Sequence, residues 1–545
     1  MPDNLLYYGD NLDVLRRHVK DESVDLVYLD PPFKSNQDYN VLFAERDGTR
    51  AAAQIKAFKD TWQWDRVAAE EFHEVVEAGG RVSQALQAFR TVLGENDMLS
   101  YLAMMAARLV ELRRVLKPTG SIYLHCDPVA SHYLKMLMDS VFAPVNFKTE
   151  IIWKRTSSHG NVSASYGDVT DSILYYARGE NPVWNQIYVP YSEEHIRRKF
   201  TYRETDGRLF TTSDLRNPGY RPNLIYEYKG YQPHPNGWAV SRKKMEEYDR
   251  QGRLYFPPKK TGRIRLKRYL DETPGERIQN LWDDIPPINS QAAERLGYPT
   301  QKPEALLERI IRASSNEGDM VLDPFCGCGT ATAVAQRLGR RWIGIDITHL
   351  AITLIKKRLR DAFGEAIDKA YTTVGEPVSL PDAEALAKQD PYQFQWWALG
   401  LIHARPVEQK KGADRGIDGR IYFHDEHDAK SATKQIIISV KAGSTTVSQV
   451  RDLVGVLDRE KAAIGVLISM QEPTQPMRAE AASAGFYETP GQEGKHYARI
   501  QLLTIAELLA ERRVDYPQFS HKLTFKPAPK ARGKKKHTHK PLEFE

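Results

Sequence analysis

The sequence predicts an α/β protein whose main part is a doubly wound, Rossmann-like sheet flanked by helices. Two junctions in the sequence support this prediction. Short apolar runs of strand type at residues 24–29 and 320–322 each lead into an Asp-Pro pair, Asp30-Pro31 and Asp323-Pro324. Open α/β sheets bind their ligands at such carboxyl ends of strands. The length of 545 residues suits roughly two or three domains.

The second of these junctions continues into a glycine loop, Cys326-Gly327-Cys328-Gly329-Thr330. Gly327 and Gly329 permit backbone conformations that are closed to other residues and let a ligand approach closely. A helix is expected over 331–338, followed by a strand over 342–346 that ends in Asp346. An acid at about this distance from the loop binds a ribose hydroxyl pair in such folds. The loop therefore fits S-adenosylmethionine, and a plain strand-to-helix turn is the alternative.

The first junction, Asp30-Pro31-Pro32-Phe33, fits a pocket for a base amino group. The nitrogen of such a group is a poor nucleophile, because its lone pair is delocalised into the ring. The Asp30 carboxylate and the Pro31 carbonyl, held by the fixed φ angles of two prolines, can accept both amino hydrogens. Phe33 can stack on a base extruded from the duplex. A simple proline turn is the alternative, and the glycine loop elsewhere in the chain argues against it.

Two further expected elements complete the first lobe. A helix is predicted over 99–116 and a strand over 121–125, in the same sheet, with His125 and Asp127 near its carboxyl end. Both are pocket candidates, although a structural role is the more natural reading for His125. Residues 141–154 are predicted to hold the last strands of the lobe.

Four segments of the chain together resemble the β-group of bacterial DNA amino-methyltransferases. They are Tyr8–Leu15, Asp30–Phe33, Tyr298–Pro303 and Asp323–Phe325. In that family the catalytic motif precedes the cofactor loop, and the target-recognition region lies between the two. The resemblance spans residues 5 to about 365. It implies adenine rather than cytosine as the target, because the catalytic motif begins with Asp rather than Ser; cytosine stays open.

The same resemblance implies roles in holding S-adenosylmethionine. Asp10 is expected near the adenine of the cofactor, Lys302 and Pro303 near its methionine end, and Asp346 at its ribose. The full expected cofactor-binding set is Asp10, Lys302, Pro303, Asp323, Phe325, Gly327, Gly329, Thr330 and Asp346.

Residues 155–297 are polar and aromatic, with interleaved basic and aromatic side chains such as Arg203, Arg208, Tyr226, Lys229 and Tyr269. Such mixtures can contact phosphates and stack on bases. The position of the segment in the chain favours DNA contact over an ordinary solvated surface. The bases that it reads depend on side-chain geometry in a groove.

The third region contains Gly416-Ile417-Asp418-Gly419 and a predicted strand over 435–441. Ser439 and Lys441 share one face of this strand, because side chains alternate between faces. The pattern resembles Mrr-like restriction endonucleases of the PD-(D/E)XK superfamily over residues 385–515. The resemblance implies a Mg²⁺ site at Asp418. Ser439 stands where the superfamily carries Glu or Gln, which weakens this metal site.

Cleavage of DNA by this region is expected, with Asp414 or Glu408 as a substitute acid. A domain that binds DNA or a partner without cutting is the alternative.

Composition adds two points. Three cysteines are too few for a disulfide framework, and residues 521–540 carry eight Lys or Arg and no acid. Such a tail should be disordered. It could hold DNA nonspecifically or serve only to solubilise the chain.

The overall prediction is a sequence-specific adenine methyltransferase acting on double-stranded DNA in the cytoplasm, without membrane association. Alternatives are a single-chain restriction-modification enzyme that also cuts, an N4-cytosine methyltransferase with a non-cutting domain, and a modification subunit with a separate restriction subunit. A homodimer stays open. The predicted domains are a catalytic lobe at 1–154, a target-recognition region at 155–297, a cofactor-binding lobe at 298–370, a C-terminal α/β restriction-endonuclease-like domain at 385–518 and a basic tail at 519–545.

Overall fold

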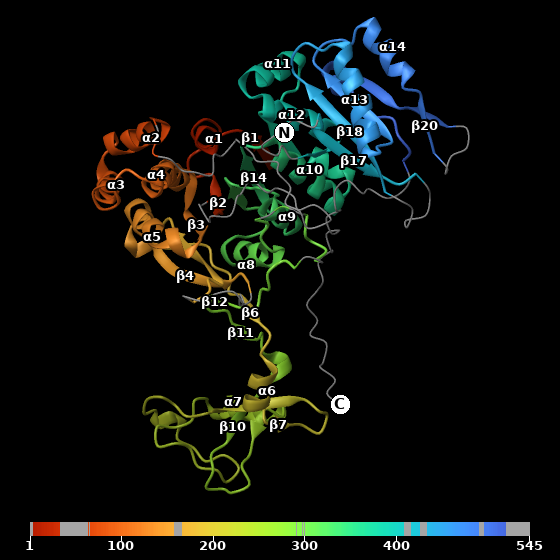
Figure 1. Cartoon of the computed structure of the whole chain (residues 1–545). Coiled ribbons are helices and arrows are strands. Elements are labelled where there is room, and N and C mark those ends of the chain that lie inside the picture. The colour runs from red at the N-terminus through yellow and green to blue at the C-terminus, as the bar shows by residue number, and fades with distance from the viewer. Residues whose placement is uncertain are drawn as a thin grey trace. The chain divides into compact units, whose positions relative to one another are not determined.

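The structure is a computed structural model (Figure 1). The residues it describes are 4–32, 64, 66–156, 166–289, 292–296, 298, 300–407, 416–425, 433–489 and 495–518. Phe33, Glu408, Asp414 and the predicted basic tail lie outside this range. The chain divides into two compact units, one built around Gln186–Gln279 and one containing the segments before and after it.

A nine-stranded sheet forms the centre of the larger unit. Strand β5 is antiparallel to both of its neighbours, and the other neighbouring pairs are parallel. The predicted α/β sheet is thus found, with one antiparallel strand inside it. The spatial order of the strands is β12 (Leu281–Trp282), β4 (Phe147–Lys154), β5 (Thr170–Ala177), β3 (Leu116–Cys126), β2 (Val24–Leu29), β13 (Met320–Asp323), β14 (Arg341–Asp346), β1 (Asn4–Tyr8) and β15 (Tyr371–Val374).

One face of this sheet is covered by five helices that share a single apolar core with it (Figure 1). The longest of them has an Asn96 N-cap, whose side chain accepts a hydrogen bond from Leu99 N–H at 3.0 Å. This helix is apolar around most of its circumference, as expected for a helix that is buried on all sides. The five are α1 (Asn11–His18), α2 (Arg66–Glu77), α3 (Gly80–Leu93), α4 (Asp97–Val115) and α5 (Pro128–Phe142).

Two boundaries in this lobe differ from the prediction. Strand β3 begins at Leu116, directly after α4, rather than at residue 121. Residues 141 and 142 end helix α5 instead of starting a strand, because Asp127 caps that helix and the chain stays helical to Phe142. Residues 170–177, which the sequence places in the target-recognition region, form the interior strand β5.

Helices α8 (Glu304–Ser314), α9 (Thr330–Arg337) and α10 (His349–Phe363) contact the sheet and one another. They lie on the face opposite α2 to α5 (Figure 1). The predicted strands at 320–322 and 342–346 and the predicted helix after the glycine loop are confirmed within one or two residues. Arg358 of α10 is buried and donates hydrogen bonds to Thr330 Oγ1 at 3.0 Å and to Glu304 at 2.8 Å. The Arg358 guanidinium therefore connects α10 with the first residues of α8 and α9.

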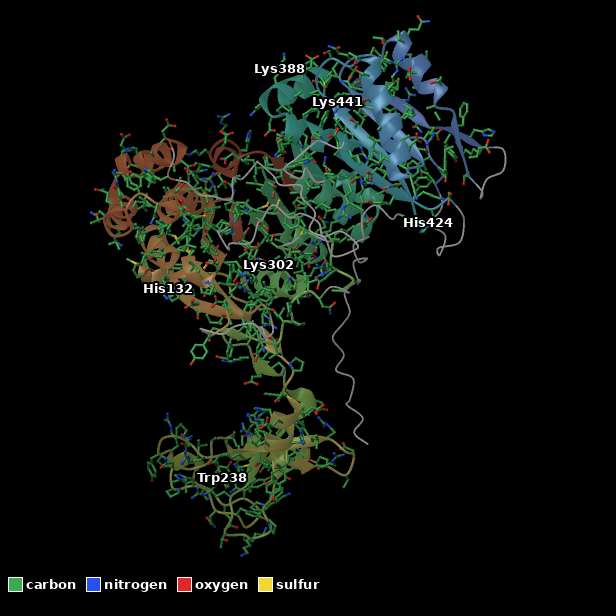
Figure 2. All side chains as sticks on the ribbon, viewed as in Figure 1. His132, Trp238, Lys302, Lys388, His424 and Lys441 are labelled. Atoms are coloured by element: carbon green, nitrogen blue, oxygen red, sulfur yellow. The ribbon has the colours of Figure 1, made fainter. Side chains whose placement is uncertain are left out.

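The smaller unit has its own core around the buried Trp238, labelled in Figure 2. Its strands are short, and a sheet of four of them runs β7-β8-β10-β9. Strands β6 and β11 pair at the two ends of its chain segment. Its elements are β6 (Tyr188–Val189), α6 (Glu193–Lys199), β7 (Tyr202–Arg203), β8 (Leu209–Asp214), α7 (Arg242–Arg250), β9 (Leu254–Tyr255), β10 (Arg265–Tyr269) and β11 (Glu276–Arg277).

The C-terminal part of the larger unit contains a five-stranded sheet with helices on both faces. Ile436 and Ile438 of its central strand enter one apolar core and Ile437 enters the other, as strand alternation predicts. Its strands in spatial order are β16 (Arg405–Pro406), β17 (Gly419–Phe423), β18 (Lys434–Lys441), β19 (Ile464–Ser469) and β22 (Ile500–Thr504), with a separate pair β20 (Phe486–Glu488) and β21 (His496–Ala498). The helices are α11 (Leu380–Gln389), α12 (Pro391–Leu401), α13 (Val447–Glu460), α14 (Gln475–Ser483) and α15 (Ile505–Leu509).

A substitution tests the packing of the glycine loop. Gly329 is left-handed, with φ +73° and ψ +35°, and a Cβ at this position would lie 2.7 Å from Ile355. We expect Gly329→Ala to cost about 1–2 kcal/mol of stability from the backbone conformation. Overpacking against Ile355 should add about 1–3 kcal/mol. Denaturant unfolding of the variant measures the loss, and a loss no larger than the backbone cost of about 1–2 kcal/mol would contradict this packing.

Candidate active site

Two acidic strand ends meet at one edge of the nine-stranded sheet. Strands β2 and β13 pair in parallel, with Leu26 opposite Val321 and Val27 opposite Leu322. Asp30 follows β2 directly and Asp323 ends β13, so the parallel pairing brings both carboxylates to the same edge. Strand β14 lies next to β13 and adds Asp346. The two motifs singled out in the sequence are therefore adjacent in space.

The glycine loop is tightly folded over the end of β14. Gly327 and Gly329 have φ angles of +48° and +73°. The Gly327 N–H donates to Asp346 Oδ2 at 2.9 Å, and the Cys326 N–H donates to the Ile345 carbonyl at 3.1 Å. A Cβ on Gly327 would lie 3.2 Å from the ring of Tyr298. Only glycine fits the loop at this position without displacing that ring.

Asp346 is held by several donors. Its Oδ1 accepts from the Thr348 N–H at 2.9 Å and from the Thr348 hydroxyl at 2.8 Å. Burial raises the pKa of Asp346 to about 6, although these hydrogen bonds act to lower it. The carboxylate therefore titrates much closer to neutral pH than an ordinary aspartate does.

Side-chain hydrogen bonds connect the turn after β1 with the loop that follows β13. Asp10 caps α1 and accepts a hydrogen bond from the buried Arg108 at 2.8 Å. Arg108 also donates to Asn11 Oδ1 at 2.6 Å, and the Asn11 amide donates to the Pro324 carbonyl at 2.8 Å. These contacts fix the position of Asp10 relative to the loop that starts at Asp323.

The Asp30 carboxylate, which the sequence predicts to be catalytic, has a cationic partner. Lys302 Nζ lies 2.5 Å from Asp30 Oδ2, and both side chains are mostly buried. Lys302 is labelled in Figure 2, and Pro303 directly after it is the N-cap residue of α8. Burial raises the pKa of Asp323 well above its usual value, the charge of Asp30 adds to this rise, and the charge of Lys302 opposes it.

A chain of polar side chains, buried except for Arg155 at its end, lies beside these residues. The Tyr28 hydroxyl lies 3.0 Å from His125 Nδ1, His125 Nε2 lies 3.0 Å from Asp171 Oδ2, and Asp171 Oδ1 lies 3.1 Å from Arg155 Nε. His125 is thus held at both ring nitrogens, and Asp127 caps α5 through the Ala130 N–H. Sequence reasoning did not single out Asp171 or Arg155, since nothing in strand β5 or its surroundings marks them before the sheet order is known.

The remaining predicted residues take the following places. Pro31 and Pro32 follow Asp30, and Phe33 lies outside the described residues. Phe325 packs partly buried against the apolar core of the sheet. Thr330 begins α9 and accepts the hydrogen bond from Arg358.

The predicted nuclease residues are close together in the C-terminal sheet. The buried Asp418 accepts hydrogen bonds at Oδ2 from the Val440 N–H at 2.6 Å and from the Ser439 hydroxyl at 3.2 Å, and Lys441 Nζ lies 3.8 Å away. The carboxylate oxygen nearest to Lys441 is therefore already occupied by the backbone. Within the described residues, no group of three or more His, Cys, Asp or Glu could hold a metal ion.

A family model described as DNA methylase matches residues 24–357, which is more than half of the chain. The chain belongs to this DNA methylase family. A second family model, described as NACHT-associated inactive Restriction Endonuclease 1, matches residues 393–510. The predicted likeness to restriction endonucleases is thus found for the C-terminal part, with a family called inactive in place of the Mrr-like one.

Three curated relatives of this methylase illustrate the range of similarity. The Type II methyltransferase M.EcaI of Enterobacter cloacae is 26% identical, over 70% of this chain and 74% of the relative. The Mod subunit of the Type III restriction-modification enzyme StyLTI of Salmonella typhimurium is 27% identical, over 62% of this chain and 50% of the relative. The DNA adenine methyltransferase YhdJ of Escherichia coli is 26% identical, over 65% of this chain and 82% of the relative.

None of the helices in the described part of the methylase is long and apolar enough to cross a membrane.

The geometry around Asp418 predicts a structural role for its carboxylate. Asp418→Ala would leave the buried Val440 N–H without its acceptor, which should cost about 1–3 kcal/mol of stability. Thermal or denaturant unfolding of the full chain, with and without magnesium, measures this loss. The loss should be the same in both conditions. If magnesium stabilises the unmodified protein and not the variant, the carboxylate binds metal instead.

Proposed function

We propose that this methylase is a site-specific DNA methyltransferase that uses S-adenosylmethionine to methylate the exocyclic amino group of an adenine, as part of a restriction-modification system. The observation that carries the proposal is the meeting of Asp30 and the glycine loop at one sheet edge in a chain of the DNA methylase family. Relatives named as restriction-modification and adenine methyltransferases support it.

The cofactor-binding roles rest on the fit of the loop. Gly327 and Gly329 have positive φ angles and little room for a Cβ, so they hold the loop in a tight turn at the carboxyl end of β13. This is the edge at which open α/β sheets bind ligands. The Asp346 carboxylate can accept hydrogen bonds from a ribose hydroxyl pair. Asp10 is proposed near the adenine of the cofactor, Lys302 and Pro303 near its methionine end. Asp323, Phe325 and Thr330 complete the proposed set by shaping and holding the loop.

The base is proposed to enter beside Asp30. The Asp30 carboxylate and the Pro31 carbonyl accept the two amino hydrogens and hold the nitrogen lone pair out of conjugation. S-adenosylmethionine supplies a methyl group whose bond to sulfur breaks as its bond to the base nitrogen forms. The methylated nitrogen then gives up one proton, and the Asp30 carboxylate is placed to receive it. Phe33 is proposed to stack on the base.

The smaller unit is proposed to contact the DNA. Several of its basic side chains are already paired with acids, for example Arg208 with Asp271 and Lys267 with Glu204. Arg263, Arg265 and Arg268 are exposed on or next to β10, and among the described residues no ion pair engages them. These three are the first candidates for phosphate contacts.

Adenine is proposed as the target because the motif begins with Asp30, and cytosine N4 is the second candidate. The C-terminal part is proposed to bind without cutting, since the Asp418 oxygen nearest to Lys441 is occupied by Ser439 and the backbone. A self-contained enzyme that also cuts with Mg²⁺ is the competing proposal. A separate restriction subunit would supply cleavage if this part does not, as the name of the StyLTI Mod relative suggests.

One assay separates these proposals. The full chain is incubated with unmethylated plasmid, with S-adenosylmethionine and magnesium each present or omitted, and methylated bases and strand breaks are both measured. We expect methyladenine and no magnesium-dependent breaks. Methylcytosine would overturn the choice of base, and breaks that prior methylation prevents would overturn the non-cutting role.

Substitution of Asp30 tests the pocket directly. Asp30→Ala should lower the methylation rate at least about 10²- to 10³-fold, because it removes an acceptor that holds the reacting nitrogen. It should not abolish cofactor binding. Lys357→Met, which removes a paired lysine on α10, serves as the control. Methylation that survives Asp30→Ala would refute the assignment.

The raised pKa of Asp346 predicts a pH dependence of cofactor affinity. An ionised carboxylate accepts both ribose hydrogen bonds, whereas a protonated one cannot, so binding releases a proton at low pH. Affinity for S-adenosylhomocysteine should be constant above about pH 7. It should fall by up to about tenfold per pH unit as the pH drops through about 6. Asp346→Asn should bind more weakly with a flat pH profile. Calorimetry at several pH values measures this, and parallel profiles for the two proteins would contradict the ribose role.

A further inference from the structure

Asp30 is engaged by Lys302 in the structure, at the carboxylate oxygen Oδ2 that lies 2.5 Å from the ammonium. The proposed role of Asp30 is to accept a hydrogen from the amino group of a base. An ammonium on this carboxylate competes with that role, because it neutralises the charge and occupies an acceptor site. The pair joins residues 272 positions apart in the chain, so it is a product of the fold and not of local sequence.

The charge of Lys302 also acts on two other carboxylates, those of Asp171 and Asp323. Burial acts to raise the pKa of Asp171, yet the hydrogen bond from His125 and the charges of Lys302 and Arg155 lower it overall. The charge of Lys302 also acts on Asp323. Asp171 already has a partner at each oxygen, His125 and Arg155. Of these three carboxylates, Asp30 is the one that lies within 2.5 Å of Lys302 Nζ.

We propose that Lys302 is a switch that covers Asp30 until the cofactor binds, and that the arriving cofactor draws it away and opens the base pocket. The proposal rests on the proposed function, since it requires S-adenosylmethionine at this sheet edge. It makes base binding dependent on prior cofactor binding, which is a form of regulation within the site.

The relative strengths of the competing contacts support this order. A hydrogen bond between two charged groups is roughly twice as strong as one between neutral groups. The amino group of a base is neutral, so it competes poorly with Lys302 for Asp30. The carboxylate of the cofactor's methionine end is charged and competes with Asp30 for Lys302 on equal terms. The positive sulfonium beside Asp30 then disfavours the return of the ammonium.

The side chain of Lys302 has the freedom to make this move. Its backbone is fixed by Pro303, the N-cap residue of α8, but a lysine carries its charge on four flexible carbons. Lys302 retains about a sixth of its side-chain exposure, 17%, at the edge where the motifs meet. A change of rotamer, without movement of α8, is therefore sufficient.

Calorimetric binding of S-adenosylhomocysteine to the full chain tests the switch without DNA. This ligand keeps the carboxylate and the α-ammonium of the cofactor and lacks its positive sulfur, so Asp30 has no charged sulfur to attract. Asp30→Asn removes the charged partner that competes with the cofactor for Lys302 and should tighten binding about fivefold or more. In a Lys302→Met background, the same Asp30→Asn change should alter affinity by less than about twofold. Asp30→Asn should raise the affinity for S-adenosylmethionine by a smaller factor, because the substitution also removes the attraction between Asp30 and the positive sulfur of that ligand.

Lys357→Met is the matched control, because Lys357 also pairs with an aspartate and is 17% exposed. It should leave affinity unchanged. An unchanged or weakened affinity of both Asp30→Asn and Asp30→Ala for S-adenosylhomocysteine would overturn the switch while leaving the methyltransferase intact. Failure of the unmodified chain to bind either ligand or to methylate DNA would overturn the proposed function itself.

Discussion

The parallel pairing of β2 with β13 is the constraint on which the rest of the methylase part depends. It joins a strand near the start of the chain to one that follows the whole inserted unit. Because both strands end in an acidic residue and a proline, the pairing sets the catalytic motif beside the glycine loop. The contact of Lys302 with Asp30 lies at this edge, and the neighbouring pairing of β13 with β14 adds the contact of Gly327 with Asp346.

Two buried arginines hold the parts of this site together. Arg108 joins Asp10 to Asn11, whose amide reaches the Pro324 carbonyl, and Arg358 joins Glu304 to Thr330. Each guanidinium has several acceptors, so the cost of burying its charge is offset by hydrogen bonds. The C-terminal site differs, because its central carboxylate, Asp418, accepts a hydrogen bond from the backbone N–H of Val440. Asp30 is instead held by a side-chain ammonium, and Asp418 by the backbone of the neighbouring strand.

Much of this arrangement could be predicted from local patterns. The strands ending at Leu29 and Asp323, the glycine loop and helix α4 each carry their signal within a short segment. The contacts of Lys302 with Asp30 and of His125 with Asp171 could not be predicted, since they depend on which strands are neighbours. The position of β5 as an antiparallel interior strand is likewise a property of the whole sheet. The hydrogen bond that Asp418 accepts from Val440 was also beyond the sequence, because its donor is a backbone N–H.

The strand order has a consequence for how the chain folds during synthesis. Strands β13 and β14 lie between β2 and β1, so the first two strands made are not neighbours and cannot pair with each other. Complete pairing of both strands requires the strands that start at Met320 and beyond. These residues leave the ribosome only after the inserted unit. Until then β2 has one unpaired edge, and such edges are prone to association with other chains. An inserted unit with its own core, able to fold early, shortens the flexible length that must be closed when those late strands arrive.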